Sequence, residues 1–241
     1  MHVQRLSILI PCYNEEQMVC DVLKMVSNAE MMFQVQKEII IVDDGSSDNT
    51  PACIKQFIQE NPGHSIKLIT HQTNRGKGAC VRSGLASATG DVIIIQDADL
   101  EYDPSEYNKL LMPIARGRAD VVYGSRFRGS EAHRVLFFLH TIGNKLLTFW
   151  SNLFTGLNLT DMETGFKMFR TDVIRKINLK ENRFGFEPEV TAKISRIKNI
   201  RIYEVGISYY GREYEQGKKI RWTDGMKAIY CVFKYNIFSR K

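Results

Sequence analysis

Residues 92–101 read Val-Ile-Ile-Ile-Gln-Asp-Ala-Asp-Leu-Glu, a run of β-branched residues followed by an acidic segment. Four β-branched residues in a row favour a buried strand. Asp97, Asp99 and Glu101 alternate where this strand runs out, so in extended backbone their carboxylates project the same way. Carboxylate oxygens are the ligands that Mg²⁺ and Mn²⁺ prefer. The stretch therefore predicts a strand whose end holds one hard divalent cation.

The acidic segment could also be a solvated turn or a calcium-binding EF-hand loop. The buried strand before the segment speaks against the solvated turn. An EF-hand loop needs Gly at its sixth position and Glu at its twelfth, and those positions are Tyr102 and Asn108 here. Calcium signalling is therefore not the expected function.

Four more short apolar runs surround this strand in the sequence, at residues 6–11, 38–42, 66–69 and 120–123. Apolar residues at helical spacing fill the intervals, at residues 15–29, 48–60, 77–88 and 104–116, with Asp48 and Asp103 as expected caps. This alternation predicts an α/β fold with a Rossmann-like, mostly parallel sheet flanked by helices.

The pattern changes after Arg126. Residues 133–156 form a long apolar and aromatic helical segment, followed by residues 161–170 and a mixed tail. The segment from 135 to 154 fits either a core helix or a helix with one face on lipid. The chain contains no repeat or Pro/Gly-rich linker, so we expect a single domain spanning residues 1–241.

The excess of positive charge lies at the C-terminus. The formal net charge is +6, and from Lys193 onward twelve basic residues face four acidic ones. Aromatic residues interleave with these charges, which favours a membrane surface or a phosphate group over a nucleic acid as the partner.

Cysteine use and the N-terminus indicate the compartment. Five cysteines form no C-x-x-C pair, and Met1 leads into the first strand pattern without the features of a signal peptide. No uncharged apolar run reaches the roughly 18 residues of a membrane-spanning helix. We therefore expect a cytoplasmic chain whose membrane contact is peripheral.

Three polar motifs follow predicted strands: residues 11–15 (Pro-Cys-Tyr-Asn-Glu), residues 43–46 (Asp-Asp-Gly-Ser) and the acidic segment. In open parallel sheets, ligands bind beyond the carboxyl ends of the strands, so the three motifs should line one crevice. Asp43 or Asp44 would hydrogen-bond a ribose hydroxyl or a base N–H, and the sequence does not separate the two. Residues 74–78 (Asn-Arg-Gly-Lys-Gly) are no Walker motif, but they would bring a helix N-terminus and Lys77 to a nucleotide.

Together with residues 124–127 (Gly-Ser-Arg-Phe), these motifs resemble family 2 glycosyltransferases, specifically the dolichyl-phosphate mannose and glucose synthases, over residues 6–225. The resemblance implies a GT-A fold with C-terminal acceptor-side helices. It implies a nucleotide-sugar half at about residues 1–125 and an acceptor and membrane-facing half at about residues 126–241. It also implies that the donor-binding residues are Pro11, Tyr13, Glu15, Asp43, Asp44, Lys77, Asp97 and Ala98.

In the synthases that the chain resembles, the acceptor is a polyprenyl phosphate. Arg126 and Arg134 best match the basic residues that hold its phosphate, and with Asp99 they are the expected catalytic residues. His140 is either a further phosphate contact or a core residue. Arg212 and Lys218 match a C-terminal basic loop that contacts phosphates.

The expected reaction is an inverting transfer of a hexose from a UDP- or GDP-sugar to dolichyl or undecaprenyl phosphate at the cytoplasmic face of a membrane, with Mg²⁺ or Mn²⁺ bound. The main alternative is a saccharide hydroxyl acceptor, which needs a carboxylate base from among Glu163, Glu187 and Glu189. More remote alternatives are a sugar-phosphate nucleotidyltransferase and a noncatalytic binding protein. A membrane-anchoring partner or a homo-oligomer stays open, and no nucleic acid is expected.

Overall fold

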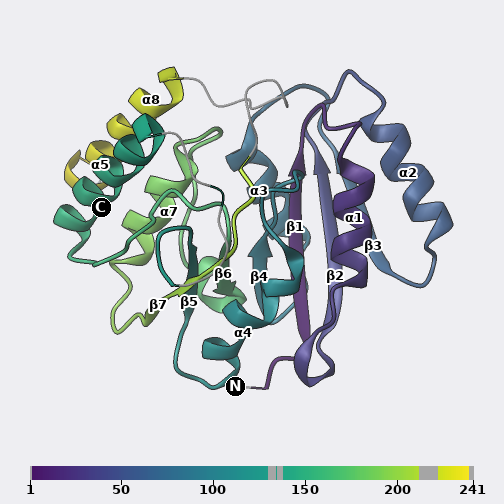
Figure 1. Ribbon diagram of the computed structural model, residues 1–241, viewed down its shortest axis with the longest axis horizontal. Coiled ribbons are helices and arrows are strands. Elements are labelled where there is room, and N and C mark those ends of the chain that lie inside the picture. Colours follow the sequence, from purple (N-terminus) through teal and green to yellow (C-terminus); the bar gives the residue numbers. More distant parts are fainter. Residues whose placement is uncertain (1, 130–133, 135–137, 212–221, 239–241) are drawn as a thin grey trace.

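A seven-stranded sheet forms the centre of the computed structural model, which describes residues 2–129, 134, 138–211 and 222–238 (Figure 1). The strand order is β3-β2-β1-β4-β6-β5-β7. The strands are β1 (Arg5–Cys12), β2 (Gln36–Asp43), β3 (Ser65–Thr70), β4 (Val92–Ile95), β5 (Val121–Ser125), β6 (Lys167–Arg170) and β7 (Ile202–Gly206). β6 runs antiparallel to both neighbours, β4 and β5, and the other pairs are parallel.

Helices connect the strands. They are α1 (Val19–Asn28), α2 (Thr50–Glu60), α3 (Lys77–Ser87), α4 (Tyr107–Ala115), α5 (Phe138–Thr155), α6 (Thr171–Ile174), α7 (Phe186–Ile194) and α8 (Trp222–Phe233). Shorter segments are the 3₁₀ turns η1 (Met32–Gln34) and η2 (Pro104–Glu106) and the π-helical segment η4 (Lys234–Phe238). None of the helices in this described part of the chain is long and apolar enough to cross a bilayer.

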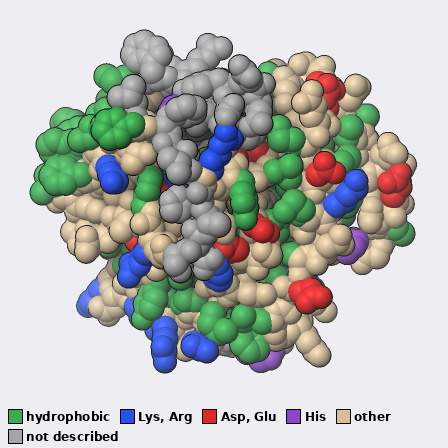
Figure 2. Space-filling model, viewed as in Figure 1, with side chains coloured by type: hydrophobic (Ala, Val, Ile, Leu, Met, Phe, Trp, Pro, Cys, Tyr) green, Lys and Arg blue, Asp and Glu red, His purple; other side chains and the backbone are tan. Residues whose placement is uncertain are grey.

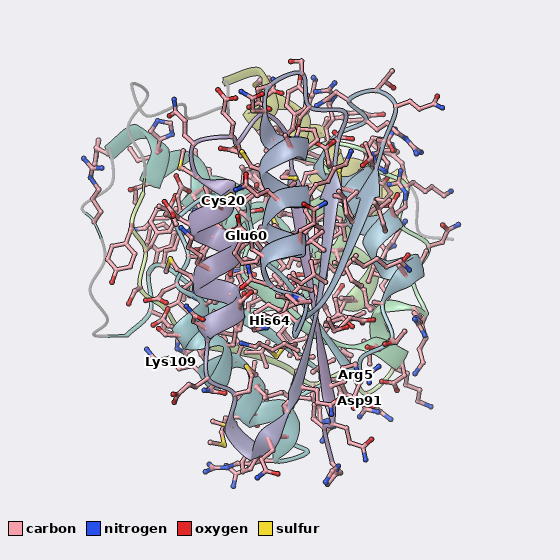
Figure 3. All side chains as sticks on the ribbon, turned by 90° about the vertical axis from the view of Figure 1, so that its right-hand side faces the viewer. Arg5, Cys20, Glu60, His64, Asp91 and Lys109 are labelled. Atoms are coloured by element: carbon pink, nitrogen blue, oxygen red, sulfur yellow. The ribbon has the colours of Figure 1, made fainter. Side chains whose placement is uncertain are left out.

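The alternation of side chains along the strands divides the core into two layers. Leu6, Ile8 and Ile10 of β1 face one side, where they pack with buried residues of α1, α2 and α4. Leu9 of β1 and Ile93 of β4 face the other side, where α3, α6 and α7 supply the apolar surface. Figure 3 shows α1 and α2 side by side over the first of these faces. The sheet is thus covered by helices on both sides.

The chain order reverses between β1 and β4, where a ligand crevice is expected. After β1 the chain moves outward through β2 and β3, and it then returns to place β4 on the other side of β1. Ligands of open α/β sheets bind at such a reversal, at the carboxyl ends of the strands. At the opposite end, the backbone N–H of Arg5 donates to Asp91 Oδ2 at 3.0 Å, which ties the two strand starts together (Figure 3).

The five expected strands and the four expected helices between them are all present, with shifts of a few residues at their ends. Asp103 caps η2 by accepting from Ser105 N, and Asp48 accepts from Thr50 N. The expected helical segment at residues 133–156 corresponds to α5, which begins at Phe138. β6, β7 and α7 were not expected, and they bring the second half of the chain into the same sheet and core.

Candidate active site

Lys77 lies between two carboxylates at the carboxyl end of the sheet. It is the first residue of α3, and its Nζ lies 2.7 Å from Asp97 Oδ1, just after β4, and 3.1 Å from Glu187 Oε1 on α7. Burial alone would lower the pKa of Lys77, but Asp97 and Glu187 raise it above its usual value. The lysine is therefore charged, and it stabilises an otherwise strongly negative site.

Asp97, Asp99 and Glu101, the expected metal ligands, each have a partner in the protein. Asp97 pairs with Lys77, Asp99 Oδ1 accepts from the N–H of Glu101 at 3.2 Å, and Glu101 Oε2 accepts from the Tyr209 hydroxyl at 2.7 Å. Their oxygens suit a hard cation, and the Lys77 ammonium shows that positive charge is stabilised beside Asp97. Among the described residues these three are not a group with ligand atoms within 4.8 Å of one another, so joint coordination requires them to move together.

Asp43 and Asp44 differ sharply in their surroundings, although both are buried at the end of β2. Asp44 accepts from Arg75 N and Gly76 N at 2.6 to 3.0 Å and contacts His71 Nδ1 at 2.7 Å. Asp43 accepts from Ser46 N through Oδ1, while its Oδ2 is buried without a hydrogen-bond partner among the described residues. Asp44 thus anchors the loop before Lys77, whereas Asp43 keeps one acceptor available.

Asp44, His71 and Cys80 form a group whose ligand-type atoms lie within 4.8 Å of one another. Both His71 ring nitrogens are already engaged in hydrogen bonds: Nδ1 contacts Asp44, and Nε2 lies 2.9 Å from Ser83 Oγ. Burial and the neighbouring Asp44 raise the pKa of the Cys80 thiol, which disfavours the thiolate that a metal needs. These contacts account for the group as the anchor of the loop.

The loop after β1 carries the expected donor residues Tyr13 and Glu15. Asn14 has a φ of +52°, and its N–H donates to Ser46 Oγ at 2.9 Å. The N–H of Glu15 donates to Thr50 Oγ1 at 2.8 Å, which fastens this loop to the loop after β2. Pro11 lies in β1, and Ala98 is buried between the acidic residues; both line the same end of the sheet.

Arg126 follows β5 and is held by Asp161. Its Nε and one terminal nitrogen donate to the two Asp161 oxygens at 2.6 and 2.7 Å, and Asn144 of α5 donates to the same carboxylate at 3.0 Å. Burial alone would raise the pKa of Asp161, but the guanidinium holds it below its usual value. The guanidinium carbon lies 5.2 Å from the Tyr209 ring centre. Arg126 is therefore a fixed cation at the edge of the crevice.

The other expected acceptor residues are placed less completely. Arg134 is exposed, and it donates through a terminal nitrogen to Gly211 O at 2.8 Å. His140 is exposed on α5, so it is not a core residue. Arg212 and Lys218 lie outside the described residues.

Glu163, just before β6, and Lys167, the first residue of β6, are two titratable groups with shifted pKa values. Lys167 is fully buried, its Nζ lies 5.1 Å from the Tyr123 ring centre, and burial lowers its pKa to about 8. Burial and the neighbouring Glu187 raise the pKa of Glu163 to about 8. Glu163 Oε1 and Glu187 Oε2 are buried without hydrogen-bond partners among the described residues.

With this geometry in place, the comparison with known proteins is decisive for the family. Residues 7–178 match the family model described as Glycosyl transferase family 2. The chain belongs to glycosyl transferase family 2. This confirms the family expected from the motifs, and the glycosyltransferase fold class is GT-A.

This family 2 glycosyltransferase is 27% identical over 213 residues to the dodecaprenyl-phosphate galacturonate synthase of Rhizobium johnstonii, covering 88% of the chain but 61% of that protein. It is 28% identical to the UDP-N-acetylglucosamine–dolichyl-phosphate N-acetylglucosaminyltransferase of Methanococcus voltae, with 92% of each chain covered. A crystal structure of glucosyl-3-phosphoglycerate synthase from Mycobacterium tuberculosis with Mn²⁺ and UDP shares the fold, with a TM-score of 0.72, 17% identity, and 97% of this chain and 80% of that chain covered.

Sequence reasoning missed several residues of the glycosyltransferase site. The full burial of Lys167 was also not foreseen, because nothing in a short, charged strand such as β6 indicates it. Tyr209 connects Glu101 with Arg126 from a position more than 80 residues away.

Glu189, one of the three candidate bases, accepts hydrogen bonds from the N–H groups of Lys180 and Glu181, so both of its oxygens are occupied.

Proposed function

We propose that this glycosyltransferase moves a hexose from a UDP- or GDP-sugar to a polyprenyl phosphate, with inversion at the anomeric carbon. The observation that carries the proposal is the place of Tyr209. Its hydroxyl donates to Glu101 on the expected metal side, and its ring lies beside Arg126 on the expected phosphate side. The names of the relatives, which combine a sugar with dodecaprenyl or dolichyl phosphate, support this choice of acceptor.

On the donor side, Asp43 Oδ2 would accept a hydrogen bond from the base or ribose of the nucleotide, since it is the acceptor left unpaired at the end of β2. Asp97, Asp99 and Glu101 would hold Mg²⁺ or Mn²⁺, which supplies neutralisation of the leaving diphosphate when bound. Mn²⁺ in the crystal structure of the mycobacterial synthase is consistent with this assignment.

On the acceptor side, Arg126, fixed by Asp161, would orient the lipid phosphate, and Arg134 would add a second positive charge. A phosphate oxygen attacks the anomeric carbon from the face opposite the nucleotide, the bond to the nucleotide oxygen breaks, and the nucleoside diphosphate leaves. A phosphate monoester is largely ionised near neutral pH, so the reaction needs orientation rather than a base.

We place the enzyme at the cytoplasmic face of a membrane, in peripheral contact through α5 and α8. Both helices expose large apolar side chains, including Leu146, Phe149 and Leu153 of α5 and Ile229 and Tyr230 of α8. Figure 2 shows hydrophobic side chains gathered at the side where these helices lie. A contiguous apolar face of this kind is typical of interfacial helices. A membrane-anchoring partner or a second copy of the chain is compatible with this placement.

The proposal treats residues 1–241 as one glycosyltransferase unit, with the donor half at about 1–125 and the acceptor half at about 126–241. It is supported by the single sheet, in which β6 of the second half lies between β4 and β5 of the first half. Lys77 and Glu187, one from each half, also meet in the crevice.

The test incubates the chain and Mg²⁺ with a panel of UDP- and GDP-sugars and either polyprenyl phosphate or an oligosaccharide, and mass spectrometry reads the products. We expect one sugar to be transferred to polyprenyl phosphate. Transfer only to the oligosaccharide would instead establish the alternative of a hydroxyl acceptor, for which Glu163 and Glu187 are the remaining bases. Release of pyrophosphate from a nucleoside triphosphate and a sugar phosphate would identify a nucleotidyltransferase.

A further inference from the structure

Two carboxylate oxygens in the crevice have no function in the mechanism above. Glu163 Oε1 and Glu187 Oε2 are buried, and neither has a hydrogen-bond partner among the described residues. By contrast, both oxygens of Asp161 accept hydrogen bonds from Arg126. A buried acceptor without a partner destabilises the fold, so a folded protein rarely keeps two of them together without a use. A bound ligand that supplies donors removes this cost.

Both carboxylates lie next to the place where the transferred group must sit. Glu187 uses its other oxygen to bind Lys77, which in turn binds Asp97. The backbone just after Glu163 also runs against Asp97, because a Cβ atom on Gly165 would lie 2.3 Å from Asp97 Oδ2. Asp97 is thus a shared neighbour, of Glu187 through Lys77 and of the backbone two residues after Glu163. Both carboxyl groups are therefore linked to Asp97, one of the residues expected to hold the metal beside the diphosphate.

The chemistry of the pair selects the ligand. The Glu187 carboxylate accepts hydrogen bonds, while Glu163, protonated up to a pH of about 8, can both donate and accept. Sugar hydroxyl groups also donate and accept, and they carry no charge to neutralise. Two ammonium groups are nearby, but Lys77 is held by Asp97 and Glu187, and Lys167 donates to the carbonyl oxygen of Thr164. Buried carboxylates also discriminate strongly, since a ligand that lacks the matching hydroxyl leaves them unpaired.

We propose that Glu163 and Glu187 form the subsite for the sugar of the donor and hydrogen-bond the hydroxyl groups of its hexose ring. This inference rests on the proposed function, because it takes the ligand to be a nucleotide-activated sugar. It assigns the two carboxylates to sugar recognition rather than to proton abstraction. The nucleoside diphosphate itself does not reach them.

Such a subsite should distinguish a nucleoside diphosphate from the same nucleotide carrying a sugar. We would measure dissociation constants by calorimetry for UDP and GDP and for UDP-glucose, UDP-galactose, UDP-N-acetylglucosamine and GDP-mannose, with Mg²⁺ and the full chain. In Glu163→Ala, affinity for the best nucleotide sugar should fall about tenfold or more, while affinity for the matching nucleotide diphosphate stays within about twofold. Glu163→Gln, which keeps an acceptor oxygen, should recover part of the loss.

The control is Glu60→Ala, which makes the same change on the exposed surface of α2 (Figure 3) and should alter neither constant. Equal weakening of nucleotide and nucleotide sugar in Glu163→Ala, or no change in either, overturns the sugar subsite. A loss of turnover at unchanged nucleotide-sugar affinity also overturns it, since that is the signature of a base. If the unmodified chain binds no nucleotide sugar at all, the proposed function fails instead.

Discussion

Lys77 holds one positive charge between two carboxylates of the crevice, 2.7 Å from Asp97 and 3.1 Å from Glu187. An ammonium in this position has two consequences. It keeps Asp97 in place beside Gly165, and it offsets the repulsion between carboxylates that one cation is expected to join. The sequence predicted a helix N-terminus that carries Lys77. It did not predict the two partners of Lys77, which come from the segment after β4 and from α7.

Lys77→Met should lower the free energy of unfolding by about 3 kcal/mol, because removing one member of a buried ion pair leaves uncompensated buried charge. Urea denaturation measures the difference. Lys109→Met is the matched control: Lys109 also lies 2.7 Å from a carboxylate, Glu106, but its side chain is 40% exposed. Because Lys109 is half-exposed and Glu106 also accepts from Ser208, this pair should be worth about 1 kcal/mol or less. Equal losses in the two variants would contradict the structural role of Lys77.

Glu163 should make stability depend on pH. Because its pKa is raised from 4.5 to about 8, the folded state keeps a proton between these values that the unfolded state has lost. Stability from this group therefore falls as the pH rises through that window, by up to about 1.4 kcal/mol per pH unit. The pKa of Lys167 is lowered from 10.5 to about 8, so between these values the unfolded state carries a proton that the folded state has lost. The stability that depends on Lys167 therefore rises with pH above about 8.

Urea denaturation of the unmodified chain and of Glu163→Gln at pH 5.5 and 7.5 tests this dependence. The glutamine variant lacks the titrating group, so it should gain stability relative to the unmodified chain on going to pH 7.5, by about 2 kcal/mol. A difference between the two proteins that is the same at both pH values would show that Glu163 titrates normally in the fold.

At the scale of elements, the sequence predicted those parts whose pattern is local. β1, β2, β3, β4 and β5 are β-branched runs, and α1 to α4 follow them with helical periodicity. β6 could not be predicted, because Lys-Met-Phe-Arg has no strand pattern and becomes a strand by pairing with residues 92–94 and 121–123. The candidate site divides in the same way: strand-end motifs were visible, while partners such as Tyr209 depend on long-range packing.

The hydrogen bonds between the loops after β2 and β3 can be tested by substituting Asp44 and Asp43. Asp44→Asn should lower the free energy of unfolding by about 2 kcal/mol, since an amide cannot accept from His71, Arg75 and Gly76 together. Asp43→Asn should leave stability nearly unchanged and weaken nucleotide binding about tenfold, because its Oδ2 is the acceptor left unpaired. Urea denaturation and calorimetry with UDP and GDP separate the two effects, and the reverse pattern would assign nucleotide contact to Asp44.

Across the whole molecule, the sheet and the helices α5 and α8 have different roles in the proposed reaction. The carboxyl ends of β1, β2 and β4 carry the donor residues, while α5 and α8 pack around α7 and present an exposed apolar surface. The positive charge of the chain lies mainly in the same C-terminal part. Apolar surface and positive charge together are the features that bind a peripheral protein to an anionic bilayer.

Phe149→Asp should weaken binding to vesicles of phosphatidylcholine and phosphatidylglycerol about tenfold, because Phe149 is 58% exposed on α5 and its insertion would be lost. Sedimentation with the vesicles measures the bound fraction. Gln59→Asp adds the same charge on the exposed side of α2 and should bind like the unmodified chain. If Phe149→Asp sediments as well as that control, α5 is not the membrane contact.

The pairing of β5 with the antiparallel strand β6 has a consequence for the segment between them. The chain leaves the sheet after Ser125, at the end of β5, and re-enters at Lys167, which pairs with Tyr123 of the same strand. Everything between, including α5, is an excursion whose two ends are fixed side by side. Closing a longer or shorter excursion costs little additional entropy. The length of this excursion can therefore change at little cost in free energy while β5 and β6 remain paired.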